Sequence, residues 1–145
     1  MILSVFTEKY PNICNRIINQ AIIDTNGYVL PVVAQWDTGA TGTCISKDVV
    51  KRCNLLPVGK VMVHTPSGTG IMNQYMINLV LNNEIRFKDF IVMDSEIGSQ
   101  GIDVLIGMDI ISMGDLAISN YAGRTLFSFR IPSQEHIEFK RDILI

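Results

Sequence analysis

Apolar and polar residues alternate along much of the chain, and this period of two is typical of strands that bury one face. The first clear example lies in residues 14–36, where two apolar runs are joined by Asn26-Gly27. This residue pair strongly favours a two-residue hairpin turn, because both residues tolerate positive φ angles. Pro31 has no backbone N–H group to donate, so part of the second run is expected at a sheet edge or a bulge.

A longer hairpin is predicted in the middle of the chain. Residues 58–65 and 70–81 are its strands, and Pro-Ser-Gly at 66–68 is its tip. In the second strand, alternate positions are apolar, so one face is expected to lie in the core. These inward positions are Tyr75, Ile77, Leu79 and Leu81.

Two short helices are predicted within this β pattern. The first spans residues 46–56: Ser46 can cap its N-terminus, apolar residues at 49, 50 and 53 can face the core, and Pro57 follows its end. The second spans residues 108–114 and ends at Gly114.

The other predicted elements are a turn at 82–83 before a strand at 84–94, a polar loop at 95–101, a short buried strand at 102–107, and a last hairpin in 115–129 that turns at 120–123.

Length and composition indicate one compact domain. The chain has 145 residues, and 48% hydrophobic residues with only 18% charged residues favour a globular fold over disorder. We expect a mainly β domain in residues 1–132, followed by a tail in residues 133–145 that could dock on the domain or on a partner. A hairpin, a strand, a small-residue loop and a short helix follow one another at 15–53 and again at 76–114, which indicates a coarse internal repeat.

Charge and hydropathy argue against two classes of partner. The formal net charge is −2 and no cluster of Lys and Arg residues is present, so there is no electrostatic case for nucleic-acid binding. No apolar run approaches the roughly 18 residues that a membrane-spanning helix needs. Residues 1–12 have too short an apolar part for a signal peptide and lack its basic region. We therefore expect a cytoplasmic protein without nucleic-acid or membrane partners.

The cysteine and histidine residues form no recognisable reactive or metal-binding pattern. The three cysteines, at positions 14, 44 and 53, are irregularly spaced, unlike a disulfide framework or a Cys-x-x-Cys metal site. Cys44 could act as a nucleophile with His64 or His136 as its base, but neither histidine has a protease context. A metal-dependent hydrolase using Asp and His also lacks the necessary ligand spacing. We therefore predict no metal and no cofactor.

One acidic residue, Asp37, stands apart from the others. It follows the apolar run Val-Val-Ala-Gln-Trp and precedes a threonine and small residues at 39, 40 and 42. Small residues let the backbone approach another segment closely, so Asp37 is expected in a tight loop at the end of a buried strand. Asp24, by contrast, begins a predicted hairpin turn, where a carboxylate commonly accepts hydrogen bonds from nearby N–H groups. Asp37 is therefore the candidate for chemistry, and Asp24 is expected to be structural.

Three segments together resemble the retroviral-type (retropepsin-like) aspartic proteases: Asp-Thr-Gly-Ala-Thr at 37–41, Thr-Cys-Ile-Ser at 43–46 and Asp-Val-Leu-Ile-Gly-Met-Asp-Ile-Ile at 103–111. The resemblance covers about residues 15–130. It implies a mainly β, closed β-barrel-like acid protease fold with two short helices, active as a C2 homodimer.

Two features depart from that family. Trp36 replaces the smaller aliphatic residue that usually precedes the acid, and its ring must find space in the core or at a subunit contact. The tip of the long hairpin, His-Thr-Pro-Ser-Gly-Thr-Gly at 64–70, is less rich in glycine than in the viral members. This second departure affects the expected mobility of the tip and the range of substrates.

The resemblance implies that Asp37 acts together with Asp37 of a second subunit. Two carboxylates about 3 Å apart share one proton, so one can activate a water while the other hydrogen-bonds the substrate carbonyl. Residues 63–72 would form a flap over the bound peptide, whereas Asp109 is expected to cap or pair locally. The implied site residues are Asp37, Thr38 and Gly39 for catalysis; Ala40, Thr41, His64, Thr65, Pro66, Ser67 and Gly68 for substrate binding; and Leu105, Ile106 and Gly107 for support.

The protein is therefore expected to be an aspartic endopeptidase that acts on peptide or protein substrates as a homodimer. The alternative is a catalytically inactive retropepsin-like dimer that serves as a peptide-binding or scaffolding module. The intact Asp-Thr-Gly triplet at 37–39 favours the enzyme.

Overall fold

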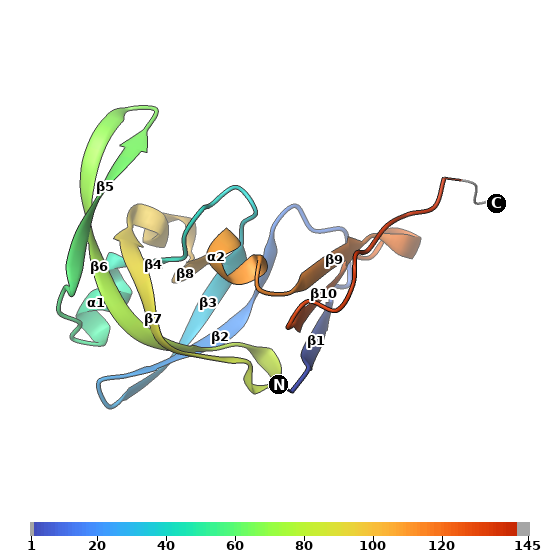
Figure 1. Cartoon of the computed structure of the whole chain (residues 1–145), viewed down its shortest axis with the longest axis horizontal. Helices are drawn as coiled ribbons and strands as arrows, with labels where there is room; N and C mark the ends of the chain where they lie inside the picture. Colours follow the sequence, from blue (N-terminus) through green and yellow to red (C-terminus); the bar gives the residue numbers. More distant parts are fainter. Residues whose placement is uncertain (1, 142–145) are drawn as a thin grey trace.

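The computed structural model describes residues 2–141 (Figure 1). Within these residues the fold is mainly β, with ten strands and two short α-helices. The strands are β1 (Ser4–Lys9), β2 (Ile17–Thr25), β3 (Tyr28–Trp36), β4 (Cys44–Ser46), β5 (Gly59–Thr65), β6 (Gly68–Val80), β7 (Arg86–Ser95), β8 (Val104–Ile106), β9 (Asp115–Ser119) and β10 (Leu126–Ile131). The helices are α1 (Lys47–Arg52) and α2 (Met108–Ile111), with 3-10 turns η1 (Asn82–Glu84), η2 (Glu96–Gln100) and η3 (Tyr121–Gly123).

Six strands of the described chain close into a barrel. Their hydrogen-bonded order is β2-β3-β8-β4-β7-β6, and the pairs Ile22↔Val80 and Ile23↔Leu79 join β2 to β6 to complete the ring. Strand β5 pairs beyond β6, and the β5–β6 hairpin stands clear of the barrel in Figure 1. The mainly β, closed-barrel fold with two short helices that the sequence predicted is therefore confirmed.

A three-stranded sheet, β1-β10-β9, packs against the barrel through aromatic side chains. The ring of Trp36, at the end of β3, has its centroid 4.9 Å from the ring centroids of both Phe127 and Phe129. Its indole N–H donates to the side-chain oxygen of Asn19 at 3.1 Å. Trp36 thus lies in the core together with Phe127 and Phe129, since all three side chains are buried.

The β2–β3 hairpin forms as predicted. Asn26 and Gly27 have φ angles of 55° and 77°, which are the positive values that a type I′ turn requires. Pro31 pairs with Ile22 of β2, whereas β8 pairs with β3 only from Ala34 onward. Pro31 therefore lies where β3 has a strand neighbour on one side, the edge position that its missing N–H favours.

Both helices form, but they are shorter than the sequence predicted. Ser46 caps α1 by accepting a hydrogen bond from the backbone N–H of Val49 at 3.2 Å, and Val49 and Cys53 are buried. Helix α1 ends at Arg52, because Asn54 takes a left-handed conformation with φ of 51°. The predicted polar loop at 95–101 contains the 3-10 turn η2.

Helix α2 ends at Ile111 rather than at Gly114. The chain passes Gly114 directly beside β10, where a Cβ atom at that position would lie 2.0 Å from the carbonyl oxygen of Arg130. Only glycine fits this crossing, so the chain turns out of the helix early to enter β9.

The coarse internal repeat is present, with one difference in order. Each copy consists of a hairpin, a loop, a short strand and a short helix: β2-β3, β4 and α1, then β6-β7, β8 and α2. The short strand follows the loop, whereas the sequence analysis placed it first. This order lets β3 pair in parallel with β8 and β4 in parallel with β7, while β4 and β8 pair antiparallel between them.

Strand β1 is an element that the sequence analysis missed. It pairs along its whole length with β10, from Ser4↔Ile131 to Lys9↔Leu126. Phe6 is its one fully core-facing residue, and its ring contacts those of Trp36 and Phe127. One buried position in six gives too short an alternation for a strand to be recognised in the sequence.

The first residues of the tail dock on the three-stranded sheet. Asp115 of β9 accepts hydrogen bonds from the backbone N–H of Gln134 at 2.7 Å and from the hydroxyl of Ser133, and it pairs with Arg130 at 2.7 Å. These three donors, with the Gln134 N–H contributing most, hold the pKa of Asp115 well below its usual range. No helix or strand is present in residues 132–141. The division of the chain at residue 132 stays a prediction, and residues 142–145 of the predicted tail lie outside the described residues.

Candidate active site

Asp37 lies in the turn that directly follows β3. Its backbone N–H donates to the carbonyl oxygen of Ile106 at 2.9 Å, and its Oδ1 accepts the backbone N–H of Gly39 at 2.8 Å. The backbone N–H of Ala40 donates to the Asp37 carbonyl at 3.2 Å, which closes the turn. Asp37 is half-buried, and Thr38 and Gly39 are exposed. The carboxylate is thus held by the backbone, and its Oδ2 accepts no hydrogen bond from residues 2–141, which leaves that oxygen free for a ligand.

Strand β8 packs against the turn that carries Asp37. Trp36 and Ile106 are partners in the parallel pairing of β3 with β8, so the acid emerges beside Gly107. A Cβ atom at Gly107 would lie 2.7 Å from the carbonyl carbon and oxygen of Gly42 and 2.9 Å from the Ala40 oxygen. These are backbone atoms that cannot move aside independently, so the close approach requires glycine. The fold therefore brings the Leu105–Ile106–Gly107 segment and the Asp37 turn into direct contact.

The N-terminus of α2 adds two backbone hydrogen bonds to the same turn. The N–H of Met108 donates to the Ala40 carbonyl at 2.7 Å, and the N–H of Asp109 donates to the Thr41 carbonyl at 3.2 Å. Backbone hydrogen bonds therefore fix the candidate residues at 37–41 to both β8 and the start of α2.

The buried Thr43 and the half-buried Asp109 form a pair that fastens the far end of this loop. The hydroxyl of Thr43 donates to Oδ1 of Asp109 at 2.7 Å, and its backbone N–H donates to Oδ2 at 2.9 Å. The Thr43 hydroxyl in turn accepts the backbone N–H of Gly107 at 3.2 Å. Asp109 Oδ1 also accepts the N–H of Ile110 at 2.9 Å, which is a local bond of the kind that the sequence analysis expected.

Sequence reasoning missed Thr43 as a member of this arrangement. Thr43 is 1% exposed, and a buried threonine needs a partner for its hydroxyl. Its position between Gly42 and the apolar Cys44-Ile45 pair was the available signal, because it placed a polar residue at the start of a buried segment.

The predicted flap residues lie on the β5–β6 hairpin, apart from the Asp37 turn. His64, Pro66, Ser67 and Gly68 are exposed, and Thr65 is the last residue of β5. His64 belongs to β5, within the strand that the sequence predicted at 58–65, and pairs with Thr69. Strand β5 pairs only with β6 in the described chain, so it is not paired with β3, the strand that leads into Asp37.

Cys44 is a poor candidate for a nucleophile. Burial, followed by the negative charges of Asp109 and Asp94, raises the pKa of its thiol, and this disfavours the reactive thiolate. Its sulfur donates weakly to the Gly42 carbonyl oxygen at 3.7 Å. Neither histidine forms a hydrogen bond with it among residues 2–141.

The described residues contain no cluster of three or more His, Cys, Asp or Glu side chains that could hold a metal ion. None of the helices in the described part of the chain is long and apolar enough to cross a membrane.

A cavity of about 500 Å³ opens beside the turn that carries Asp37. Thr38 lines it on one side and Met108 and Ile111 of α2 on another, while His136 and Ile137 of the tail complete it. The candidate site therefore borders an unfilled hollow at the molecular surface rather than a closed pocket.

A comparison of the sequence with family models relates this chain to known proteins. Residues 22–113 match the family described as "gag-polyprotein putative aspartyl protease". A comparison with curated proteins found no match.

Solved structures share the fold at low sequence identity. A retropepsin-like aspartic protease from Rickettsia conorii aligns with a TM-score of 0.56 and 12% identity, over 90% of this chain and 96% of that one. The EIAV protease in complex with the inhibitor HBY-793 gives 0.51 and 15%, over 68% and 86%. The Simian Foamy Virus protease gives 0.50 and 19%, over 66% and 92%. The fold of this chain is thus retropepsin-like, as the sequence resemblance implied.

Proposed function

The chain belongs to the gag-polyprotein aspartyl protease family, and from this premise we propose that it is an aspartic endopeptidase that hydrolyses peptide bonds as a homodimer. The observation that carries the proposal is the position of Asp37. This half-buried acid directly follows a barrel strand, and the backbone N–H of Gly39 holds one of its carboxylate oxygens, while the other accepts no hydrogen bond from residues 2–141.

A second copy of the chain is required by the chemistry. Attack of water on a peptide needs one group to take a proton and another to supply one. Two carboxylates about 3 Å apart share a single proton and fill both roles, as in known aspartic proteases. The chain has one Asp-Thr-Gly triplet, so the second acid would be the partner subunit's Asp37 across a two-fold axis. The open hollow beside Thr38 is consistent with a surface that a partner covers.

The roles of the other site residues follow from this arrangement. The ionised Asp37 activates a water, and the protonated one hydrogen-bonds the scissile carbonyl. The tetrahedral intermediate then collapses with proton transfer to the leaving amine, and no covalent enzyme intermediate forms. Thr38 bonds across the axis, the Gly39 N–H holds the carboxylate, and Ala40 and Thr41 border the bound peptide. Leu105, Ile106 and Gly107 support the turn from below.

The β5–β6 hairpin acts as the flap in this proposal. Residues 63–72 close over an extended peptide that binds through main-chain hydrogen bonds, and closure excludes bulk water from the acids. The hairpin tip from His64 to Gly68 then contacts the substrate. The enzymatic domain comprises residues 1–132.

The test is a digestion of mixed peptides at several pH values with the native chain and with Asp37→Asn. We expect the variant to lose peptidase activity while it keeps its fold and its oligomeric state, because the change removes a charge at the surface of the turn. Asp89→Asn is the matched control, since Asp89 is exposed on β7, and it should retain full activity. Retained activity in Asp37→Asn would refute the proposal. Absence of activity in the native chain with an intact dimer would favour the inactive peptide-binding alternative.

Two further properties distinguish a shared site from a monomeric one. Specific activity should fall on dilution as the subunits separate, and turnover by a chain shown to be monomeric would contradict the shared dyad. Activity should also favour acidic pH, because one of the two carboxylates must keep its proton. An optimum well above neutral would speak against the dyad.

A further inference from the structure

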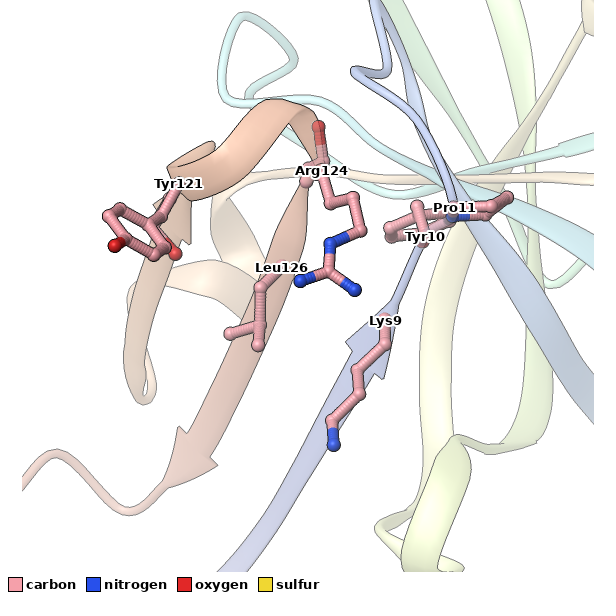
Figure 2. Close-up of a pocket in the computed structure, with 8 residues that line it drawn as sticks. Lys9, Tyr10, Pro11, Tyr121, Arg124 and Leu126 are labelled. Atoms are coloured by element: carbon pink, nitrogen blue, oxygen red, sulfur yellow. The ribbon is translucent and has the colours of Figure 1, made fainter.

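A second cavity, of about 540 Å³, lies at the end of the three-stranded sheet and involves none of the candidate protease residues (Figure 2). Its volume falls within the range typical of small-molecule sites. Eight residues line it: Lys9, Tyr10, Pro11, Ser119, Tyr121, Arg124, Thr125 and Leu126.

The floor of the cavity is a row of side chains across the outer face of the sheet. Lys9 of β1 is the direct partner of Leu126 of β10, and Leu126 is the direct partner of Ser119 of β9. Directly paired residues of neighbouring strands project from the same face. The next residue of β10, Phe127, is fully buried on the opposite face, so this row faces away from the core.

The rim is built by a tight turn between β9 and β10. The backbone N–H of Arg124 donates to the Tyr121 carbonyl at 3.3 Å, and the two residues between them, Ala122 and Gly123, have φ angles of 56° and 74°. This turn sets Tyr121 and Arg124 at the mouth of the cavity. In Figure 2 the Arg124 side chain reaches from the turn into the space over Leu126, towards the strand that carries Lys9.

The charges of the lining residues are all of one sign. Lys9 and Arg124 are cationic, and no Asp or Glu lines the cavity. Neither cation takes part in an ion pair among residues 2–141, where the ion pairs involve Lys47, Arg52, Arg86 and Arg130 instead. The neighbouring acid Glu8 projects from the other face of β1 and lines a different cavity. Two cations that form no ion pair in residues 2–141 therefore line one hollow of a chain whose formal net charge is −2.

Four of the other lining residues provide apolar surface. Leu126 and Pro11 are aliphatic, and Tyr121 is 88% exposed, so its ring is free to cover a ligand. Tyr10 offers its ring only, because its hydroxyl already donates to the Ile18 carbonyl at 2.7 Å. Rings and aliphatic groups around a cationic pair suit a planar apolar body that carries an anionic group.

We propose that this cavity is a binding site for a phosphate monoester on a planar apolar group. The doubly charged phosphate contacts Arg124 and Lys9, since a guanidinium binds phosphate oxygens through paired N–H donors and an ammonium acts as a point charge. The planar group lies over Leu126 between the rings of Tyr10 and Tyr121. Nucleotides and phosphotyrosine share this chemistry. The site is separate from the proposed peptidase function and does not depend on it.

The test is a titration of the full chain with phenyl phosphate, followed by amide NMR shifts at Lys9, Tyr121, Arg124 and Thr125. We expect saturable binding with a dissociation constant of about 1 mM or tighter at low salt, and weaker binding as salt screens the exposed cations. Arg124→Gln and Lys9→Gln should each weaken binding about tenfold or more, whereas the matched control Lys88→Gln, an exposed lysine of β7, should leave it unchanged. Both cations are exposed, so these variants should fold, which thermal unfolding checks.

Three results would overturn the proposal. One is the absence of saturable shifts with phenyl phosphate. Another is equal binding of neutral phenol, which would show that the cations do not select the ligand, and a third is equal binding of inorganic phosphate, which would exclude the planar group. Parallel titrations with adenosine monophosphate and O-phosphotyrosine identify the source, since the tighter binder carries the preferred planar group. Asp37→Asn should bind phenyl phosphate as tightly as the native chain does. The phosphate site and the proposed peptidase function are therefore tested independently of each other.

Discussion

Replacement of Thr43 by valine tests whether the Thr43–Asp109 pair fastens the turn that carries Asp37. Valine has nearly the same shape as threonine, so the change removes a hydroxyl and little volume. Asp109 then loses the donor at 2.7 Å but keeps the N–H groups of Thr43 and Ile110, both at 2.9 Å. The N–H of Gly107 loses its acceptor at 3.2 Å in a buried position.

The expected cost follows from these two losses. A hydrogen bond to a charged group contributes about 1.5–3 kcal/mol, and a buried N–H left without a partner costs about 1–3 kcal/mol. The new methyl group offsets part of this, so we expect Thr43→Val to lower the free energy of unfolding by about 2–4 kcal/mol. For a chain of this length, that corresponds to a melting temperature lower by roughly 5–15 °C.

Chemical denaturation and thermal unfolding measure this effect, and Thr43→Ser supplies the sharpest comparison. Serine keeps the hydroxyl and loses one buried methyl group, which costs about 1 kcal/mol. If the hydroxyl fastens the loop, Thr43→Val should be less stable than Thr43→Ser. If only apolar packing matters at this position, Thr43→Ser should be the less stable variant. Thr41→Val, at an exposed position of the same loop, should change stability by less than about 0.5 kcal/mol. A valine variant as stable as the serine variant would refute the role assigned to the hydroxyl.

Three other substitutions probe the site and its surroundings. Gly107→Ala should destabilise the fold by about 1–3 kcal/mol and abolish peptidase activity, because its Cβ would lie 2.7 Å from the Gly42 carbonyl; unchanged melting would contradict the close approach. Asp115→Asn should lower the free energy of unfolding at neutral pH and reduce the further loss of stability below about pH 4. The pKa of Asp115 is lower in the folded than in the unfolded chain, so its ionised form stabilises the fold above the ordinary carboxyl pKa, and this contribution disappears as the pH falls. Parallel curves of stability against pH for the variant and the native chain would contradict this. Cys44→Ala should keep peptidase activity, since burial and nearby acids raise the pKa of that thiol, and inactivity with an intact fold would revive the cysteine nucleophile.

Local signals in the sequence account for much of the fold. The Asn26-Gly27 turn, the alternation in β6 and the Ser46 cap each act over a few residues, and the structure has all three. The three segments at 37–41, 43–46 and 103–111 together likewise indicated the family before any coordinates. Such signals are local, because the φ angles of a turn and the side-chain acceptor of a helix cap depend on the residues themselves.

The tertiary structure decided the features that join distant segments. Thr43 and Asp109 are 66 positions apart, and only closure of the barrel makes one the partner of the other. The same closure brings Gly107 against Gly42 and places the ring of Trp36 between the two sheets. Strand β1 also depends on it, because its pairing with β10 supplies the order that its short alternation does not encode. The sequence by itself determined which turns, caps and strands can form and which acid is the candidate for chemistry, whereas the packing of segments remote in the chain determined how that acid is held.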